Sequence, residues 1–222
     1  MLLMKAWMET RWRLLVLAVY LLIALALNYR NPAGTGVLAT AWCMLMFLAI
    51  SLGGSGVKSQ APLGPSEGVT GSTQFTISLP VTRLRLFAVR TAVGLVETAA
   101  VTAATAFLIW AFFPTVRDIA TAADLTRLVL TTILFLIAPY CAHAFFSTWS
   151  DEPFSIAYAG FTLILLLWLC HHLTPAVDIL RAFGQASPFE THKLPWSQLA
   201  PSLLAAGILS LAAIQVVRRR EY

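Results

Sequence analysis

The stretch LVLTTILFLIAPYCAHAFF, from Leu128 to Phe146, contains no Asp, Glu, Lys or Arg. At 1.5 Å per residue, a helix of this length nearly spans a hydrocarbon core about 30 Å thick. Apolar runs of about 20 residues with few or no charges are typical of transmembrane helices. The stretch therefore predicts an α-helix that crosses a lipid bilayer.

The whole chain has the composition of a membrane protein. Its 222 residues are 59% hydrophobic and only 11% charged, and the mean hydropathy is +0.78. A soluble domain carries charge on roughly a quarter of its residues, so the composition excludes that class. The net charge of +5 is too weakly clustered to predict nucleic-acid binding. The three cysteines lie in apolar runs and predict neither a disulfide framework nor a zinc site.

Five other apolar stretches are also long enough to cross a membrane. The sequence therefore predicts an all-α, polytopic membrane protein with six transmembrane helices in a single domain, residues 1–222. The predicted spans are 12–28, 36–52, 86–113, 128–146, 154–173 and 199–217. The first is the weakest, because its uninterrupted apolar core, LLVLAVYLLIALAL, covers only residues 14–27. That length also suits a signal peptide, with Ala24-Leu25-Ala26 resembling a cleavage site.

Basic residues are distributed unequally between the two sides that this topology defines. With six spans both termini lie on one side, which collects ten basic residues against five on the other. The positive-inside rule therefore predicts that both termini are cytoplasmic. The membrane predicted with this topology is the plasma (inner) membrane. Cleavage of the first span would leave an odd number of spans, so an uncut first helix is favoured. The five basic residues on the external side are Arg30, Arg117, Arg127, Arg181 and Lys193.

The topology assigns each polar segment to one side of the membrane. Residues 53–85 form the largest cytoplasmic loop, and residues 174–198 form an external loop. The segment 1–11 places Leu3 and Trp7 on one side of a helix, with Lys5 on another. This pattern predicts an amphipathic helix in the cytoplasmic interface. The alternative is a flank of the first span whose charged side chains extend towards water.

The cytoplasmic loop opens with GGSGVKS, Gly53 to Ser59, which nearly matches a phosphate-binding loop. That loop has the form G-x-x-x-x-G-K-[ST], because the lysine must follow the last glycine directly to reach the phosphates. Here Val57 separates Gly56 from Lys58, and no predicted strand precedes the glycines. The pattern favours a flexible tether, so we expect no nucleotide site in this chain.

The end of the loop, FTISLPVTRLRL from Phe75 to Leu86, puts a proline and two arginines directly before an apolar run. Pro80 can serve as the first residue of a helix, where its missing N–H costs nothing. Phe75 and Leu79 are four residues apart, which fits one side of a short interfacial helix. Phe75, Ile77 and Leu79 also alternate, so the local conformation is left open.

This segment resembles the Ser-Leu-Pro-Val-[Ser/Thr]-Arg segment between the second and third spans of the ABC-2 type permeases, the membrane subunits of ABC exporters. The resemblance extends to the N-terminal KAWMETRWR, to six spans with both ends inside, and to the C-terminal RRREY. In that family the loop holds a coupling helix that docks on a separate ATPase subunit. Family members often carry an acidic run just before this point, whereas the approach here has only Glu67.

The resemblance implies both a coupling site and a set of partners. The partners are a cytoplasmic ABC ATPase, a second permease subunit that is identical or related, and the lipid bilayer. ATP would act through the ATPase, and no cofactor would be bound by this chain itself. The implied coupling residues are Phe75, Leu79, Pro80, Thr82, Arg83 and Arg85.

Two ionisable residues lie inside predicted spans, and a residue of this kind is by default a candidate for a functional role. Glu97 is interpreted as structural, through Arg90 or threonine hydroxyls, rather than as a group that handles substrate or protons. His143 is interpreted as a packing histidine rather than a proton relay. Beside Glu97 runs a stripe of small and polar residues that suits close helix packing. The stripe consists of Thr91, Gly94, Thr98, Thr102 and Thr105.

The external side carries His171, His172, Asp178 and His192, but none is spaced as a known set of metal ligands. No metal site is therefore predicted. The sequence also contains no H-E-x-x-H motif, and no catalytic residue is predicted.

The sequence thus predicts the permease subunit of an ATP-driven exporter, which is not itself an enzyme. One alternative is a membrane-embedded protease or lipid-modifying enzyme that uses Glu97, His143 or the external histidines. This alternative predicts that Glu97 and His143 face a common cavity, whereas a permease tolerates their separation. The other alternative is a membrane scaffold that does not transport. The substrate and the direction of transport are left open.

Overall fold

The computed structural model describes residues 11, 15–16, 18–19, 22–23, 35–53, 82–119, 121–148, 150, 152–174, 176–183 and 186–219. Within these ranges every regular element is helical and none is a strand, which confirms the predicted all-α fold class. The predicted interfacial helix, 1–11, falls outside the described residues apart from Arg11. Of the predicted span 12–28, only six positions are described, and all are helical and exposed: Leu15, Val16, Ala18, Val19, Leu22 and Ile23.

The five longest described helices follow the predicted spans closely, and three shorter helices have no predicted counterpart. The elements are α2 (Thr35–Gly53), α4 (Arg83–Phe112), α5 (Pro114–Ile119), α6 (Ala122–Phe146), α7 (Glu152–Leu173), η1 (Ile179–Phe183), α8 (Pro188–Thr191) and α9 (Trp196–Arg219). The largest difference is at the start of α6, which begins six residues before the predicted boundary at Leu128. The predicted external loop, 174–198, contains η1 and α8 and ends inside α9.

Four of the described helices are long and apolar enough to cross a membrane: Leu84–Phe112, Ala122–Phe146, Phe154–Leu173 and Trp196–Arg219. The apolar part of α2, Ala41–Gly53, is shorter. The described part of the chain therefore has the helices of a membrane protein, and the two further spans stay predictions.

The ends of α4 follow from its sequence. Thr82 is the N-cap, with extended backbone, and its side-chain oxygen accepts a hydrogen bond from the backbone N–H of Arg85 at 3.2 Å. The helix therefore begins at Arg83, which corrects the expectation that Pro80 opens it. At the other end Phe113 is extended, as a residue before a proline tends to be, and Pro114 opens α5.

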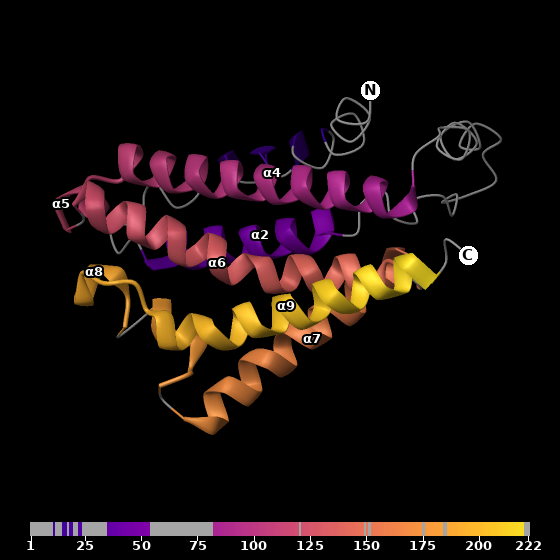
Figure 1. Cartoon of the computed structure of the whole chain (residues 1–222). Helices are drawn as coiled ribbons and strands as arrows, with labels where there is room; N and C mark the ends of the chain where they lie inside the picture. Colours follow the sequence, from indigo (N-terminus) through magenta and orange to yellow (C-terminus); the bar gives the residue numbers. More distant parts are fainter. Residues whose placement is uncertain are drawn as a thin grey trace.

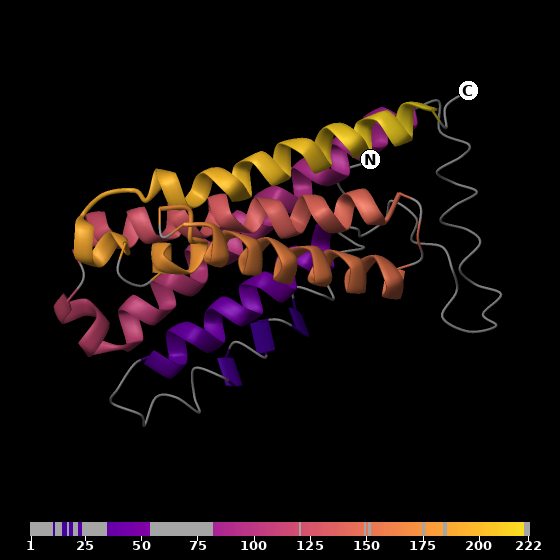
Figure 2. The same ribbon diagram turned by 90° about the horizontal axis from the view of Figure 1, so that it is seen from below.

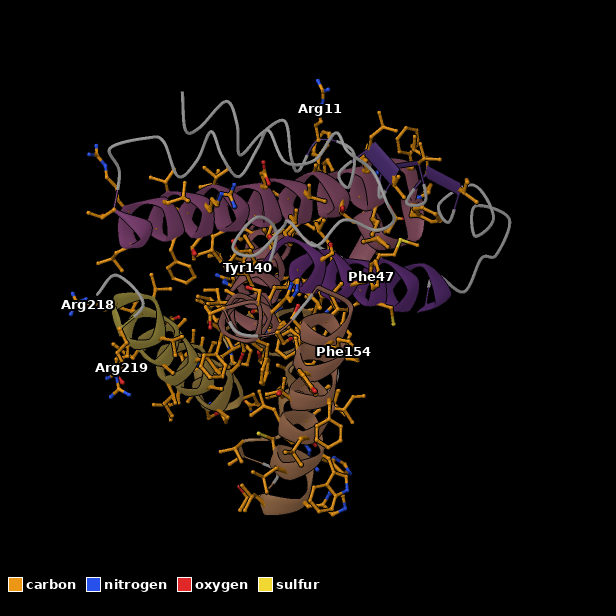
Figure 3. All side chains as sticks on the ribbon, turned by 90° about the vertical axis from the view of Figure 1, so that its right-hand side faces the viewer. Arg11, Phe47, Tyr140, Phe154, Arg218 and Arg219 are labelled. Atoms are coloured by element: carbon orange, nitrogen blue, oxygen red, sulfur yellow. The ribbon has the colours of Figure 1, made fainter. Side chains whose placement is uncertain are left out.

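Helix α6 lies at the centre of the bundle. It packs against α2, α4, α7 and α9 (Figure 1). Of its most apolar stretch 61% is buried, against 22% for the corresponding stretches of α7 and α9. Figure 2 shows α2 and α9 on opposite sides of it, and Figure 3 shows Tyr140 of α6 in the middle of the bundle.

The bundle has two different ends, which we name from their residues. The arginine end contains the start of α4, the end of α6 and the end of α9, with Arg85, Arg218 and Arg219 exposed. The α8 end contains α5, η1 and α8 together with the start of α6 (Figure 1).

Helix α4 buries several polar residues and exposes several large apolar ones. At 30 residues α4 is about 45 Å long, and Glu97 lies near its middle. The exposed face of α4 carries Val96, Phe107 and Phe112. This arrangement suits a lipid environment, because lipid solvates apolar side chains and leaves polar ones to pair within the protein. The buried polar and charged residues of α4 are Arg90, Glu97, Thr98, Thr102 and Thr105.

Pro139 lies inside α6, and a neighbouring helix replaces the hydrogen bond that this proline removes. Proline has no N–H, so the carbonyl of Phe135, four residues earlier, loses its intrahelical donor. The hydroxyl of Ser202 on α9 donates to this carbonyl at 3.1 Å. Ser202 and Phe135 are both fully buried. The proline therefore creates an acceptor that α9 satisfies, and the bond fixes the position of α9 along α6.

We expect Ser202→Ala to destabilise the folded protein by about 1 kcal/mol, because it leaves the Phe135 carbonyl without a donor in a dry interior. In a Pro139→Ala background the backbone N–H at 139 returns, so the same Ser202→Ala change should cost much less. Unfolding of the purified protein in mixed micelles would measure all four members of this cycle. Equal costs of Ser202→Ala in both backgrounds would contradict the assignment.

Gly53 is the last residue of α2 and lies against the backbone of α6. A Cβ atom at this position would overlap the carbonyl oxygen of Tyr140. Gly53 is buried and helical, so it belongs to the packed bundle. This corrects the prediction that the flexible loop 53–85 starts here, and the loop also ends earlier, because Arg83 to Arg85 belong to α4. Residues 54–81 lie outside the described residues.

We expect Gly53→Ala to destabilise the protein by about 1–3 kcal/mol, because a helix backbone would have to move to admit the methyl group. Gly160→Ala on α7 is the matched control, since nothing lies within 4 Å of a Cβ there. The control should be neutral or stabilising by up to about 1 kcal/mol, the usual gain of alanine over glycine in a helix. The two changes can be compared by thermal unfolding in detergent.

Candidate functional site

The arginine end holds the described part of the predicted coupling segment. Thr82 is exposed and caps α4, and Arg83 is the first residue of that helix. The side chain of Arg85 is exposed, one turn from the cap. Thr82 and Arg85 are thus brought together by the cap itself. Phe75, Leu79 and Pro80 lie outside the described residues.

The base of α4 is firmly attached to the bundle. Phe87 is buried in a cluster with Ala144 of α6 and with Ala213 and Val217 of α9. Leu84 packs against the same cluster. The apolar contacts begin only two residues after the cap, so a displacement of the capped end would act directly on α6 and α9.

The two ends of the bundle differ in charge. Among the described residues, the arginine end carries five basic residues and one acidic residue, whereas the α8 end carries four of each. The charged residues of the arginine end are Arg83, Arg85, Arg90, Arg218, Arg219 and Glu152. Those of the α8 end are Arg117, Arg127, Arg181, Lys193, Asp118, Asp124, Asp178 and Glu190. Figure 3 shows Arg218 and Arg219 at the periphery of the bundle.

The two intramembrane residues singled out in the sequence are both buried. Glu97 is 8% exposed, on the face of α4 that also buries Arg90. His143 is fully buried, and its Nε2 shares a hydrogen bond of 2.9 Å with the hydroxyl of Ser155 on α7. This contact connects two neighbouring helices, α6 and α7.

The α8 end contains a cavity of about 390 Å³ between α2, α4, α5, α6, η1 and the segment around α8. Neither Glu97 nor His143 lines it. No charged side chain is among its lining residues, and the polar ones are Trp42, Thr102, Thr105, Thr132 and Ser187. The apolar walls come from Ala41, Leu45, Ala106, Ile109, Val116, Leu125, Leu128, Val129, Phe183 and Phe189. This is a partly open, uncharged site of a size that suits a small molecule.

Two polar atoms in the cavity wall have no hydrogen-bond partner within the described part of the chain: Trp42 Nε1 and Thr105 Oγ1. Thr98, Thr102 and Thr132 each donate to the carbonyl four residues earlier, at 2.7–2.9 Å. Thr105 does not follow this pattern, although it is only 2% exposed. Both atoms are themselves buried, so the surrounding protein encloses them and they are not open to the cavity.

The segment that closes the cavity at α8 is tied to α6 by a buried carboxylate. Asp124 is 2% exposed and accepts hydrogen bonds from Thr121 Oγ1 at 2.6 Å and from Arg127 Nη1 at 2.8 Å. Its Oδ1 also accepts from Nδ1 of His192 at 2.9 Å. His192 has a φ of 53° and is the C-cap of α8, and Phe189 of that helix lines the cavity. The Asp124–His192 bond therefore positions one wall of the site.

Of the other two histidines, His171 makes a similar bond to an aspartate and His172 does not. His171 Nδ1 donates to Asp178 Oδ2 at 3.0 Å, which joins the end of α7 to the start of η1. His172 Nδ1 instead contacts the carbonyl of Trp168 at 2.9 Å. The two histidine–aspartate pairs are separate, and in the described ranges no three His, Cys, Asp or Glu side chains gather as a metal site.

Several residues of these sites were not found from the sequence. Asp124 stands in the pattern Thr121-Ala-Ala-Asp124, a helix-capping signal that could have placed the start of α6. Ser155, Ser202 and Trp42 carry no local signal, because their roles depend on which helices pack together.

Comparison of the chain with protein-family models, with curated proteins and with solved structures finds no match in any of the three.

We expect His192→Gly to release α8 from α6. Glycine accepts the left-handed backbone of this position without strain, so any loss of stability reports the missing ring. Hydrogen exchange at the amides of Glu190 and Thr191 should become about tenfold faster, the effect of losing one hydrogen bond to a buried carboxylate. Lys193→Ala, an exposed neighbour, is the control and should leave the exchange rates unchanged.

Proposed function

We propose that this chain is the membrane-spanning subunit of an ATP-driven exporter of the ABC-2 type. In this proposal it has six spans with both ends cytoplasmic, in a plasma (inner) membrane, and pairs with a second permease subunit. It binds no nucleotide itself, and a separate cytoplasmic ATPase subunit hydrolyses ATP.

The observation that carries the proposal is the continuity of α4 with the segment that resembles the coupling loop. The residues Thr82-Arg83-Leu84-Arg85 are the cap and first turn of a helix of 30 residues that runs the length of the bundle (Figure 1). A rigid helix of this kind is what a cytoplasmic motor needs in order to move elements inside the bilayer.

Two further observations support the same proposal. The contacts of Leu84 and Phe87 with α6 and α9 offer a direct mechanical connection from the coupling segment to the bundle. The excess of basic residues at the arginine end matches the positive-inside rule and favours the cytoplasmic side for that end. Exposed arginines beside the cap also supply a surface for an acidic partner.

The alternative of a membrane-embedded enzyme has one observation in its favour, the hydrogen bond between His143 and Ser155. A serine hydrolase needs this pair, but also access for its substrate. Both side chains are fully buried, and the cavity at the α8 end contains neither. The pair is therefore better explained as a bond between α6 and α7, and the permease proposal is preferred.

The proposal can be tested by charge reversal at the arginine end. In native membranes, Arg85→Glu should reduce both the amount of ABC ATPase that co-purifies with the tagged chain and its ligand-stimulated ATP hydrolysis, each by about tenfold. Folding should be retained, because the Arg85 side chain is exposed and its backbone N–H still reaches Thr82.

Arg117→Glu is the matched control, since Arg117 is exposed at the α8 end and should affect neither measurement. Wild-type chain that brings down no ABC ATPase would contradict the proposal. Association with an ATPase that no ligand stimulates and no variant uncouples would favour the scaffold alternative.

A further inference from the structure

Helix α9 exposes a row of side chains that we call the α9 stripe. Its members follow one another every three or four residues up to a pair of arginines, so they lie on one side of the helix. The opposite side of α9 is buried against the bundle through Ser202, Ala206, Ala213 and Val217. The stripe therefore faces the medium that surrounds the bundle. It consists of Leu204, Ile208, Leu211, Gln215, Arg218 and Arg219, all of them exposed.

The α9 stripe is apolar along most of its length and polar at its end. Leu204, Ile208 and Leu211 are 64–67% exposed. From Leu204 to Gln215 the helix rises by about 16 Å, which is close to half of a hydrocarbon core about 30 Å thick. The apolar part of the stripe thus has the length of one lipid leaflet, and the polar part follows where the lipid headgroups begin.

Arg218 and Arg219 carry positive charge that the described part of the chain does not neutralise. Both side chains point away from the bundle in Figure 3, and neither forms an ion pair with a described residue. At the α8 end, by contrast, Arg127 bonds Asp124 at 2.8 Å. The negative end of the α9 dipole is equivalent to about half a charge, which two guanidinium groups exceed. The end of the stripe can therefore hold an anion.

Gln215 lies between the apolar part of the stripe and the arginines. Its side chain is exposed and bonds no described residue. The amide NH₂ group can donate two hydrogen bonds, and a donor that stays unbonded in an apolar medium is costly. In a glycerolipid the ester carbonyls lie between the acyl chains and the phosphate. They therefore stand at the level of Gln215.

We infer that the α9 stripe binds an anionic phospholipid from the leaflet at the arginine end. One acyl chain lies along Leu204, Ile208 and Leu211, and Gln215 donates to an ester carbonyl. Arg218 and Arg219 bind the phosphate, for which the guanidinium group is well suited. A soluble anion would match the arginines but not the apolar part. The inference does not rest on the exporter proposal, because neither arginine belongs to the coupling segment.

The test compares two photoreactive lipids on the full chain in phosphatidylcholine nanodiscs. The probes are phosphatidylglycerol and phosphatidylcholine, each with the same diazirine in the middle of one acyl chain. Peptide mass spectrometry measures the labelling of each helix. We expect the anionic probe to label the α9 stripe about tenfold more than the zwitterionic probe, because each arginine near an anionic lipid contributes severalfold. Helix α7 exposes Phe161 and Ile164 but contains no Lys or Arg, so both probes should label it equally.

A matched pair of double variants makes the experiment specific. Arg218→Gln with Arg219→Gln should make labelling of α9 by the two probes nearly equal. Arg117→Gln with Lys193→Gln removes the same charge from exposed positions at the α8 end and should leave the tenfold preference unchanged. All four side chains are exposed, so folding should be retained.

Gln215→Leu tests the contact with the ester. It should lower labelling of α9 by both probes about fivefold, the effect of one net hydrogen bond, because both lipids carry esters. Labelling that does not change would overturn this role of Gln215.

Equal labelling of the wild-type α9 stripe by the two probes would overturn the inference. A preference for the anionic probe that survives the loss of both arginines would overturn it too. The same preference on α7 would show a general attraction of anionic lipid to the protein and no site on α9.

Discussion

The fold depends on polar contacts made by one helix, α6, inside an apolar medium. Between helices in a bilayer there is no hydrophobic driving force, so close packing and hydrogen bonds must hold them together. Ser202 donates to the carbonyl that Pro139 leaves free, Tyr140 donates to the carbonyl of Thr91 at 3.1 Å, and His143 bonds Ser155. These contacts join α6 to α9, α4 and α7 in turn. They lie within a few residues of one another, which makes this part of α6 the point from which the other helices take their positions.

This central position connects the two ends of the molecule. At the arginine end, the first turns of α4 pack against the last turns of α6 and α9. At the α8 end, the first turn of α6 holds His192 through Asp124, and the same helix lines the cavity. Helices α4 and α6 thus contact each other at the arginine end and both line the cavity at the α8 end. Under the exporter proposal, these shared helices would carry a displacement of α4 from one end of the bundle to the other.

Much of the fold could be predicted from the sequence, and much of the candidate site could not. The spans 36–52, 154–173 and 199–217 differ from α2, α7 and α9 by no more than three residues at either end, because apolar length alone marks a helix in a membrane. The start of α6 was missed, since Asp124 and Arg127 look like loop residues until their mutual bond and the Thr121 cap are seen. The sequence predicted that Gly53 starts a flexible loop. The structure shows instead that Gly53 packs against the backbone of Tyr140. The sequence predicted the stripe of small and polar residues on α4 as a packing surface. It did not show that Thr105, unlike Thr98 and Thr102, makes no hydrogen bond to the carbonyl four residues earlier.

By itself, the sequence determined the class of protein, the helical fold and the approximate ends of most helices, because these follow from local composition and from the cost of exposing backbone groups to lipid. It also singled out the segment that leads into α4 and resembles a coupling loop. Only the tertiary structure decided which carbonyl Ser202 satisfies, which aspartate His192 meets and where a cavity is left between six elements. Those contacts join residues as far apart as 67 and 68 positions in the chain, and no local pattern specifies such pairs. They arise when helices of fixed length pack around α6 and each buried polar group must find its partner there.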